Sequence, residues 1–247
     1  MFQFHTIHFE SLPSTNLEAA RQAGEGAPEG ICIVAREQTA GRGRMGRLWI
    51  SPRDAGIYCS TLLRPQFDQN RWPLITLMAA VVVQEALLEA CALQTDIKWP
   101  NDILYDEKKL CGILAEIIET SPGRAVVVGI GINLTNDSFP AELAETATSI
   151  AEATGRQPHR EDILGKLQES FVGWYQRLSE PQGAADIVAA WSRRSSYARD
   201  KKVRINDAGR EISGTTRGLE LDGALKVESD DGEMTIIRAG DVSVRSR

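Results

Sequence analysis

The stretch of residues 125–134 constrains the fold more than any other part of the chain. Its sequence, AVVVGIGINL, is almost wholly apolar and rich in β-branched residues. Such a strand is typically buried on both faces, as in a sheet that helices cover. Gly129 and Gly131, and Gly112 in a second predicted strand over 108–116, weaken strands unless another group comes close to the backbone. A ligand across the sheet explains all three glycines, whereas a helix packed on the sheet explains any one of them equally well.

The remaining segments predict an α+β fold with a mixed sheet flanked by helices. Apolar runs bounded by turn residues indicate strands, and apolar residues at helical spacing indicate helices. The predicted strands cover 4–9, 31–35, 56–63, 95–98, 108–116 and 125–134, and the predicted helices cover 15–23, 72–93, 144–153, 160–178 and 187–195. Thr15 and Glu18 form a predicted capping box at the start of the first helix.

The pattern changes after residue 200. Short strands are predicted at 203–205, 211–215, 224–227, 234–237 and 242–244, with turns at 206–209, 222–223 and 230–232. These segments predict a small all-β barrel. We therefore divide the chain into one domain over 1–198 and a second over 199–247.

Composition restricts the class of protein. The formal net charge is −6, which argues against generic nucleic-acid binding because that function usually needs a basic face. The four cysteines are widely spaced, and three lie in apolar runs, as expected for buried thiols in a reducing compartment. The N-terminus lacks a leader pattern, and the longest apolar run, 74–83, is too short to span a bilayer. We expect a cytoplasmic protein with no membrane segment.

Residues 37–49 form the first candidate site. In this stretch, EQTAGRGRMGRLW, three arginines alternate with three glycines. Glycine allows close approach of the backbone, and arginine offers a planar fork of donors for phosphate or carboxylate. The spacing also fits G-x-G-x-x-G, but the turn at 50–56 follows where a dinucleotide fingerprint needs a helix. The stretch therefore predicts a loop that closes over an anion; the alternative is a disordered, solvated loop.

Residues 98–102, KWPND, form the second candidate site. Pro100 fixes a turn and restricts Trp99, so Lys98, Asn101 and Asp102 are held on a rigid corner between two strands. Asp102 could bind Mg²⁺ or orient a lysine, and Lys98 could contact phosphate. The alternative is a surface turn with a buried tryptophan.

Five motifs, in this order, resemble those of the biotin–protein ligases. They are STN at 14–16, GRGRMGR at 41–47, KWPND at 98–102, KLCGIL at 109–114 and GIGIN at 129–133. The resemblance covers essentially the whole chain. Met45 departs from it where a polar or basic residue is frequent, and Cys111 where a small residue is common.

The resemblance implies a biotin ligase-like mixed sheet with an SH3-like C-terminal barrel. The two candidate sites and the resemblance together give three groups of predicted site residues. The implied catalytic residues are Lys109, Arg44, Lys98 and Asp102, with Asp102 also the implied metal ligand. The implied biotin site is Ser14, Thr15, Asn16, Gln38, Gly41, Arg42, Gly43, Arg44, Lys109, Gly112 and Gly129. The implied ATP or adenylate site is Arg42, Arg44, Arg47, Trp49, Lys98, Asn101, Gly131, Asn133 and Arg217.

The resemblance also implies the reaction and the partners. ATP and Mg²⁺ would activate biotin as biotinyl-5′-AMP, and a lysine of a biotin carboxyl carrier protein would then receive biotin. The carrier would belong to acetyl-CoA carboxylase or another biotin-dependent carboxylase, and the enzyme is a possible homodimer. Some family members carry an N-terminal DNA-binding domain, but here the STN motif begins almost at the N-terminus, so we expect none.

Two other functions remain open at this point. The first is a lipoate-type ligase on a related fold, which the acid that drives ATP–pyrophosphate exchange would distinguish. The second is a non-enzymatic nucleic-acid binder that uses the arginine loop and the barrel, which the acidic charge opposes.

Overall fold

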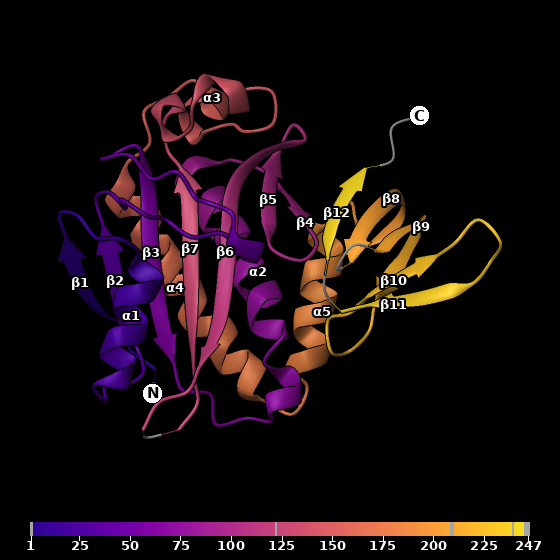
Figure 1. Ribbon diagram of the computed structural model, residues 1–247, viewed down its shortest axis with the longest axis horizontal. Helices are drawn as coiled ribbons and strands as arrows, with labels where there is room; N and C mark the ends of the chain where they lie inside the picture. Colours follow the sequence, from indigo (N-terminus) through magenta and orange to yellow (C-terminus); the bar gives the residue numbers. More distant parts are fainter. Residues whose placement is uncertain (1, 122, 208–209, 239, 245–247) are drawn as a thin grey trace.

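The computed structural model describes residues 2–121, 123–207, 210–238 and 240–244. Figure 1 shows a large sheet with helices on both faces and a smaller β-domain beside it. The strands of the large sheet are β1 (His5–Phe9), β2 (Ile31–Ala35), β3 (Gly56–Leu63), β4 (Asp96–Lys98), β5 (Asp102–Tyr105), β6 (Lys108–Ile118) and β7 (Ala125–Asn133). They lie in the order β1-β2-β3-β7-β6-β5-β4, and β1 is parallel to β2 while the other pairs are antiparallel. The predicted mixed sheet is confirmed, with the apolar strand β7 at its centre.

Helices cover the two faces of the sheet unequally. They are α1 (Thr15–Gly24), α2 (Leu74–Cys91), α3 (Ile150–Thr154), α4 (Arg160–Ser179) and α5 (Gly183–Arg194). The main core forms where α2, α4 and α5 pack together behind the sheet, and α1 alone packs on β2, β3 and β7 from the other side (Figure 1). The face that carries α1 therefore has room for a site.

Helix α2 is long and apolar enough to cross a membrane by length and composition. However, 67% of its 18 residues are buried within the molecule. That burial is typical of the central helix of a hydrophobic core.

Two local predictions are wrong. The helix predicted over 144–153 is reduced to α3, because the backbone before it pairs with the start of β6: the N–H of Lys109 donates to the carbonyl of Thr146, and the N–H of Thr148 donates to the carbonyl of Lys109. The capping box is absent too. Ser14 is the N-cap of α1 and makes no side-chain cap, while the side chain of Thr15 binds Gln38.

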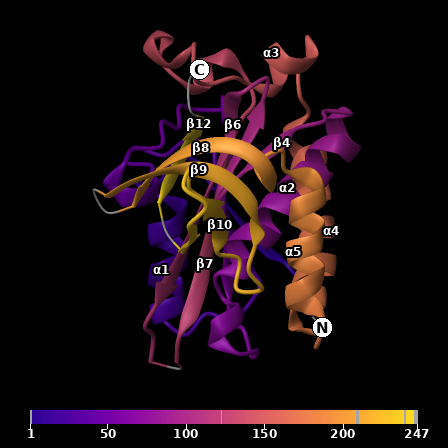
Figure 2. The same cartoon turned by 90° about the vertical axis from the view of Figure 1, so that its right-hand side faces the viewer.

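The C-terminal segment forms a separate antiparallel sheet, as predicted. Its strands are β8 (Arg199–Asp207), β9 (Arg210–Leu219), β10 (Leu225–Glu228), β11 (Met234–Ile237) and β12 (Asp241–Val244), in the order β11-β10-β9-β8-β12. Residues 208–209 of the predicted turn at 206–209 lie outside the described residues. Figure 2 shows this sheet beside α5 and the edge of the large sheet. The indole N–H of the buried Trp99 donates to the carbonyl of Gly223 at 3.0 Å, which ties the KWPND corner to the barrel.

Candidate active site

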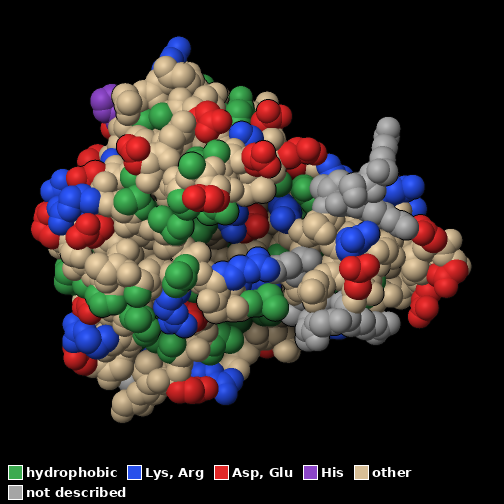
Figure 3. Space-filling view, turned by 45° about the horizontal axis from the view of Figure 1, so that its top comes forward, with side chains coloured by type: hydrophobic (Ala, Val, Ile, Leu, Met, Phe, Trp, Pro, Cys, Tyr) green, Lys and Arg blue, Asp and Glu red, His purple; other side chains and the backbone are tan. Residues whose placement is uncertain are grey.

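A hollow lies between the arginine loop and the α1 face of the sheet. The space in it that the centre of a water-sized sphere can occupy is about 110 Å³. It is lined by Ser14, Thr15, Asn16, Gln38, Arg42, Gly43, Arg44, Arg47, Leu48, Trp49, Asn101, Asp102, Lys109, Gly112, Ile113, Leu114, Gly129, Ile130 and Gly131. Figure 3 shows basic and acidic side chains meeting at the central hollow of this side of the molecule. The hollow is thus lined by residues from all five motifs, and the fifth motif contributes Gly129 to Gly131.

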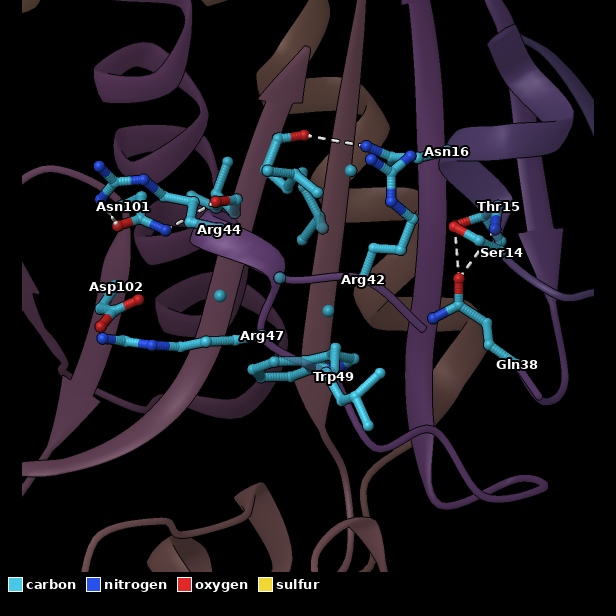
Figure 4. Close-up of a pocket in the computed structure, with 18 of the residues that line it drawn as sticks. Ser14, Thr15, Asn16, Gln38, Arg42, Arg44, Arg47, Trp49, Asn101 and Asp102 are labelled. Carbon is cyan, nitrogen blue, oxygen red and sulfur yellow. Dashed lines mark hydrogen bonds between the residues drawn. The ribbon is translucent and has the colours of Figure 1, made fainter. Parts of the chain in front are cut away.

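One end of the hollow is polar and uncharged. Gln38 receives hydrogen bonds at its amide oxygen from the N–H of Thr15 at 2.8 Å and from the Thr15 hydroxyl at 3.1 Å (Figure 4). Its amide nitrogen donates to the Ser51 hydroxyl at 2.8 Å. Ser14, Thr15 and Asn16 are each buried. Fixed amide and hydroxyl groups of this kind suit a small polar ligand.

Ser60 joins this group and was not predicted. Its hydroxyl, which is fully buried, lies 2.7 Å from the Thr15 hydroxyl and 2.6 Å from the amide oxygen of Asn16. The amide nitrogen of Asn16 in turn donates to the Leu114 carbonyl at 3.2 Å and to Glu116 at 2.8 Å. In the sequence, the only signal for Ser60 was the adjacent polar pair Ser60–Thr61 in a mainly apolar strand.

Side chains of the site lie against the three strand glycines. A Cβ at Gly129 would overlap the amide oxygen of Asn16, and a Cβ at Gly131 would overlap the indole nitrogen of Trp49. A Cβ at Gly112 would lie 2.9 Å from the Trp49 ring. Gly112 and Gly131 are directly opposite on β6 and β7, so together they form a flat seat for the indole. The glycines therefore permit the close approach of two side chains of the site, those of Asn16 and Trp49.

The arginine loop is folded back on itself and tied to the sheet. The N–H of Gly43 donates to the Arg47 carbonyl at 2.7 Å, across a short 3₁₀ turn at Arg44–Gly46. Gly46 has φ of 74°, a conformation that favours glycine. Arg42 forms an ion pair with Glu116 at 2.9 Å, and Figure 4 shows its side chain extending toward Asn16.

Arg44 extends to the opposite side of the loop. Its guanidinium donates to the amide oxygen of Asn101 at 2.9 Å and to the Gly240 carbonyl of the barrel at 3.4 Å. Asn101 is buried and donates to the Ile113 carbonyl at 2.8 Å, so it gives Arg44 a fixed partner. The loop, the KWPND corner and the C-terminal domain thus meet at Arg44.

Two lysines lie near the carboxylate of Asp102. Its oxygens lie 2.7 Å from the Lys109 ammonium and 3.9 Å from the Lys98 ammonium, and Figure 4 shows Arg47 extending toward it. This geometry fits the orientation of a lysine by Asp102, and the binding of Mg²⁺ by Asp102 stays a prediction. The described residues contain no group of three or more His, Cys, Asp or Glu side chains able to hold a metal.

A second hollow adjoins the first behind the Trp49 side chain. It is lined by Leu48, Trp49, Ile50, Lys109, Asn133, Ser138, Phe139, Leu143, Thr146 and Ala147. The amide nitrogen of Asn133 donates to the Thr148 carbonyl at 2.9 Å. The buried indole N–H of Trp49 has no hydrogen-bond partner among the described residues. Trp49 and Lys109 therefore separate a polar hollow from a more apolar one.

Three of the implied site residues line neither hollow. Gly41 lies at the base of the loop, where a Cβ would overlap the Trp49 carbonyl. Lys98 lies 3.9 Å from Asp102, which lines the first hollow. Arg217 lies on β9 of the barrel and pairs with Glu228 at 2.5 Å and with Asp200, so its implied contact with the nucleotide has no support from this geometry.

Among the residues that the structure describes, the site contains no available thiol nucleophile. Cys32, Cys59 and Cys111 are buried, as predicted, and burial raises the pKa of the Cys111 thiol. A neutral thiol in the core is unreactive. The chemistry of the hollow must therefore come from its cations and its hydrogen-bond donors.

Comparisons with known proteins agree with this geometry. Residues 8–133 match the Biotin/lipoate A/B protein ligase family, and residues 200–245 match the Biotin protein ligase C terminal domain. The bifunctional ligase/repressor BirA of Bacillus subtilis is 38% identical over 242 residues, which span 95% of this chain and 73% of that protein. The biotin–[acetyl-CoA-carboxylase] ligase of Paracoccus denitrificans is 36% identical over 230 residues, which span 90% of this chain and 94% of that protein.

A solved structure shows the same fold. The biotin protein ligase of Aquifex aeolicus in complex with biotin and ATP has a TM-score of 0.85 and 28% identity, over 98% of this chain and 99% of that chain. Both the catalytic sheet and the C-terminal barrel are therefore shared with enzymes of one kind. The chain belongs to the Biotin/lipoate A/B protein ligase family, and it is a biotin protein ligase.

Proposed function

We propose that this protein activates biotin with ATP to biotinyl-5′-AMP and transfers the biotin to a lysine of a biotin carboxyl carrier protein. One observation carries the proposal: a hollow with an uncharged polar end, at Thr15 and Gln38, continues into a cationic end at Arg44 and Lys109. This arrangement fits a ligand with a neutral polar head and a carboxylate. The relatives and the solved structures are biotin ligases, which favours biotin over lipoate.

The two hollows suggest how the substrates lie. The neutral ring of biotin would bind at the Ser14–Asn16 turn and Gln38, with its carboxylate directed at Lys109. The α-phosphate of ATP would bind beside Lys109, Arg44 and Arg47. The base would lie in the second hollow, against Trp49 and near Asn133.

The first step joins two anions. A carboxylate oxygen of biotin attacks the α-phosphorus of ATP, and the bond from that phosphorus to pyrophosphate breaks. Lys109 and Arg44 stabilise the charge that gathers on the phosphoryl oxygens, and Asp102 holds Lys109 in place. We expect Mg²⁺ to be held mainly by the phosphates of ATP, which is the usual arrangement when a protein offers few carboxylates.

The second step transfers the acyl group. The amine of a carrier lysine attacks the carbonyl carbon of the mixed anhydride, and AMP leaves. Water would attack the same carbon, so the arginine loop must exclude water until the carrier arrives.

ATP–pyrophosphate exchange tests the proposal. Biotin should drive exchange without any carrier protein, whereas lipoate at the same concentration should not. Exchange driven by lipoate alone would identify a lipoate-type ligase, and no exchange with either acid would refute activation of either acid. Retention of DNA by the protein, lost at high salt, would instead support the nucleic-acid-binding function.

Two further expectations accompany the proposal. We expect a cytoplasmic enzyme, and a homodimer is the oligomeric state to be tested. The mass in solution, measured by light scattering with and without biotin and ATP, tests the dimer. A monomer under both conditions would exclude it.

The arginine loop should be protected from proteolysis by ligands. Arg42 and Arg47 are exposed on a glycine-rich loop, and an anion bound against the loop arginines would hold that loop in place. Trypsin should therefore cleave after these arginines in the protein alone, and biotin with ATP should slow that cleavage. Cleavage after Arg124, which is exposed in the β6–β7 turn, serves as the internal control. Equal cleavage of the loop in both samples would count against a lid.

Gly131→Ala should weaken ATP binding. The new Cβ would displace the Trp49 ring from its seat on β6 and β7. Stacking of a base on an aromatic ring is worth about 1–3 kcal/mol, so we expect roughly tenfold weaker ATP binding. Gly165→Ala is the matched control, because a Cβ there meets nothing within 4 Å. Unchanged ATP affinity in Gly131→Ala would mean that Trp49 does not contact the base.

A further inference from the structure

Glu116 lies just outside the hollow, yet it holds two of the side chains that line it. It follows Gly112 and Leu114 at alternate positions of β6, so it faces the same side of the sheet. One carboxylate oxygen accepts from the Asn16 amide at 2.8 Å, and the other lies 2.9 Å from the Arg42 guanidinium. No motif in the sequence singled out Glu116.

The contacts of Glu116 continue as a chain of hydrogen bonds along the polar end of the hollow. From Glu116 the chain runs through Asn16, Ser60, Thr15, Gln38 and Ser51, whose hydroxyl donates to the Trp49 carbonyl at 3.1 Å. The arginine loop is therefore attached at both ends. Arg42 is held by Glu116, and Trp49 is held by Ser51.

Asp102 and Glu116 each pair with different cations of the site. Asp102 faces Lys109 and Lys98 at the cationic end, whereas Glu116 faces Arg42 beside the uncharged end. Figure 4 shows the consequence for the loop: Arg42 extends toward Asn16, and Arg44 extends toward Asn101.

We propose that Glu116 is a positioning residue that assigns Arg42 to the biotin end of the site and fastens the arginine loop over it. The inference rests on the proposed function, because it takes the hollow to bind biotin at Thr15 and Gln38. It adds that the cations act at different ends of the hollow: Arg42 closes the biotin end, and Arg44 and Lys109 bind the phosphate.

Glu116→Gln tests the inference. The amide can still accept from Asn16, but it loses the charge that holds Arg42. Because the Arg42 and Glu116 side chains are 43% and 28% exposed, the effect of the pair is reduced by solvent. We expect the Kd and KM for biotin to rise by about three- to tenfold, while the exchange rate at saturating biotin and the KM for ATP stay within about twofold. If Glu116 had a merely structural role, the variant would instead have a lower melting temperature, and its KM values for biotin and for ATP would both rise.

A double-mutant cycle separates the pair from other effects. Arg42→Gln should raise the KM for biotin to a similar degree, and the double variant should add little, because each change breaks the same contact. Glu119→Gln is the control, since Glu119 pairs with Arg124 outside the site. If Glu116→Gln has a lowered melting temperature, the KM for biotin of Arg42→Gln tests the inference instead, because that change breaks the same contact from the arginine loop.

The outcomes distinguish this inference from the proposed function. A parent protein that binds biotin, together with variants that bind it equally well, overturns only the inference. Additive effects in the double variant overturn it too. A parent protein that binds no biotin overturns the proposed function, and the inference with it.

Discussion

Replacing Lys109 with alanine is expected to lower biotin-dependent exchange by about two to three orders of magnitude, as removal of one preorganised donor to a developing charge does elsewhere. The Lys109 ammonium lies between the two hollows, 2.7 Å from Asp102 and 5.5 Å from the centre of the Trp49 ring. It is thus placed where carboxylate and α-phosphate would meet. Since that contact strengthens in the transition state, the loss should appear mainly in kcat.

The neighbouring lysine provides the control for this variant. Lys108 pairs with Glu152 at 3.6 Å and lines neither hollow. Lys108→Ala should exchange normally. Asp102→Asn removes the carboxylate that orients Lys109. Its exchange rate should lie between the rates of Lys108→Ala and Lys109→Ala. Near-normal exchange in Lys109→Ala would remove this lysine from the reaction.

Replacing Arg44 with glycine is expected to uncouple the two steps. The variant keeps Lys109 and the polar end at Thr15 and Gln38, so biotinyl-5′-AMP should still form. It loses the contacts of Arg44 with Asn101 and with the barrel at Gly240. Loss of a charge-assisted contact of about 1.5–3 kcal/mol corresponds to roughly ten- to more than a hundredfold faster escape of the intermediate, if the effect falls on the off-rate.

Released adenylate acylates any exposed lysine. The Arg44→Gly variant should therefore biotinylate bystander proteins, whereas the parent labels only its carrier. Arg53→Gly is a suitable control, because Arg53 pairs with Glu10 at the surface and lines neither hollow. Equal bystander labelling by parent and Arg44→Gly, with adenylate formation confirmed in each, would show that Arg44 does not retain the intermediate.

The fold was largely predictable because it follows from local patterns. The apolar run of β7 places that strand at the centre of the sheet, and the alternation of short strands and turns after residue 200 indicates the barrel. The helix predicted over 144–153 failed for a non-local reason. Its composition favours a helix, but its backbone forms hydrogen bonds with Lys109 on a distant strand.

The site was predictable where it consists of unusual residue combinations. The arginine loop and the KWPND corner were visible in the sequence, and the structure brings them together at Arg44 and Asn101. The partners of the strand glycines were not visible, since Trp49 and Asn16 reach them only through the tertiary fold. Ser60 and Glu116 were missed because a polar residue on one strand face resembles ordinary alternation until its neighbours are known.

The retained intermediate is the central feature of the account, and a single-turnover experiment tests it most directly. The enzyme is incubated with biotin and ATP labelled at the α-phosphate, without carrier, and is separated from free nucleotide before a carrier protein is added. We expect labelled biotinyl-5′-AMP to remain with the enzyme and then to disappear as the carrier lysine is biotinylated, with one labelled AMP released for each biotin transferred. Absence of enzyme-bound adenylate before the carrier is added, or biotinylation without AMP release, would contradict the account.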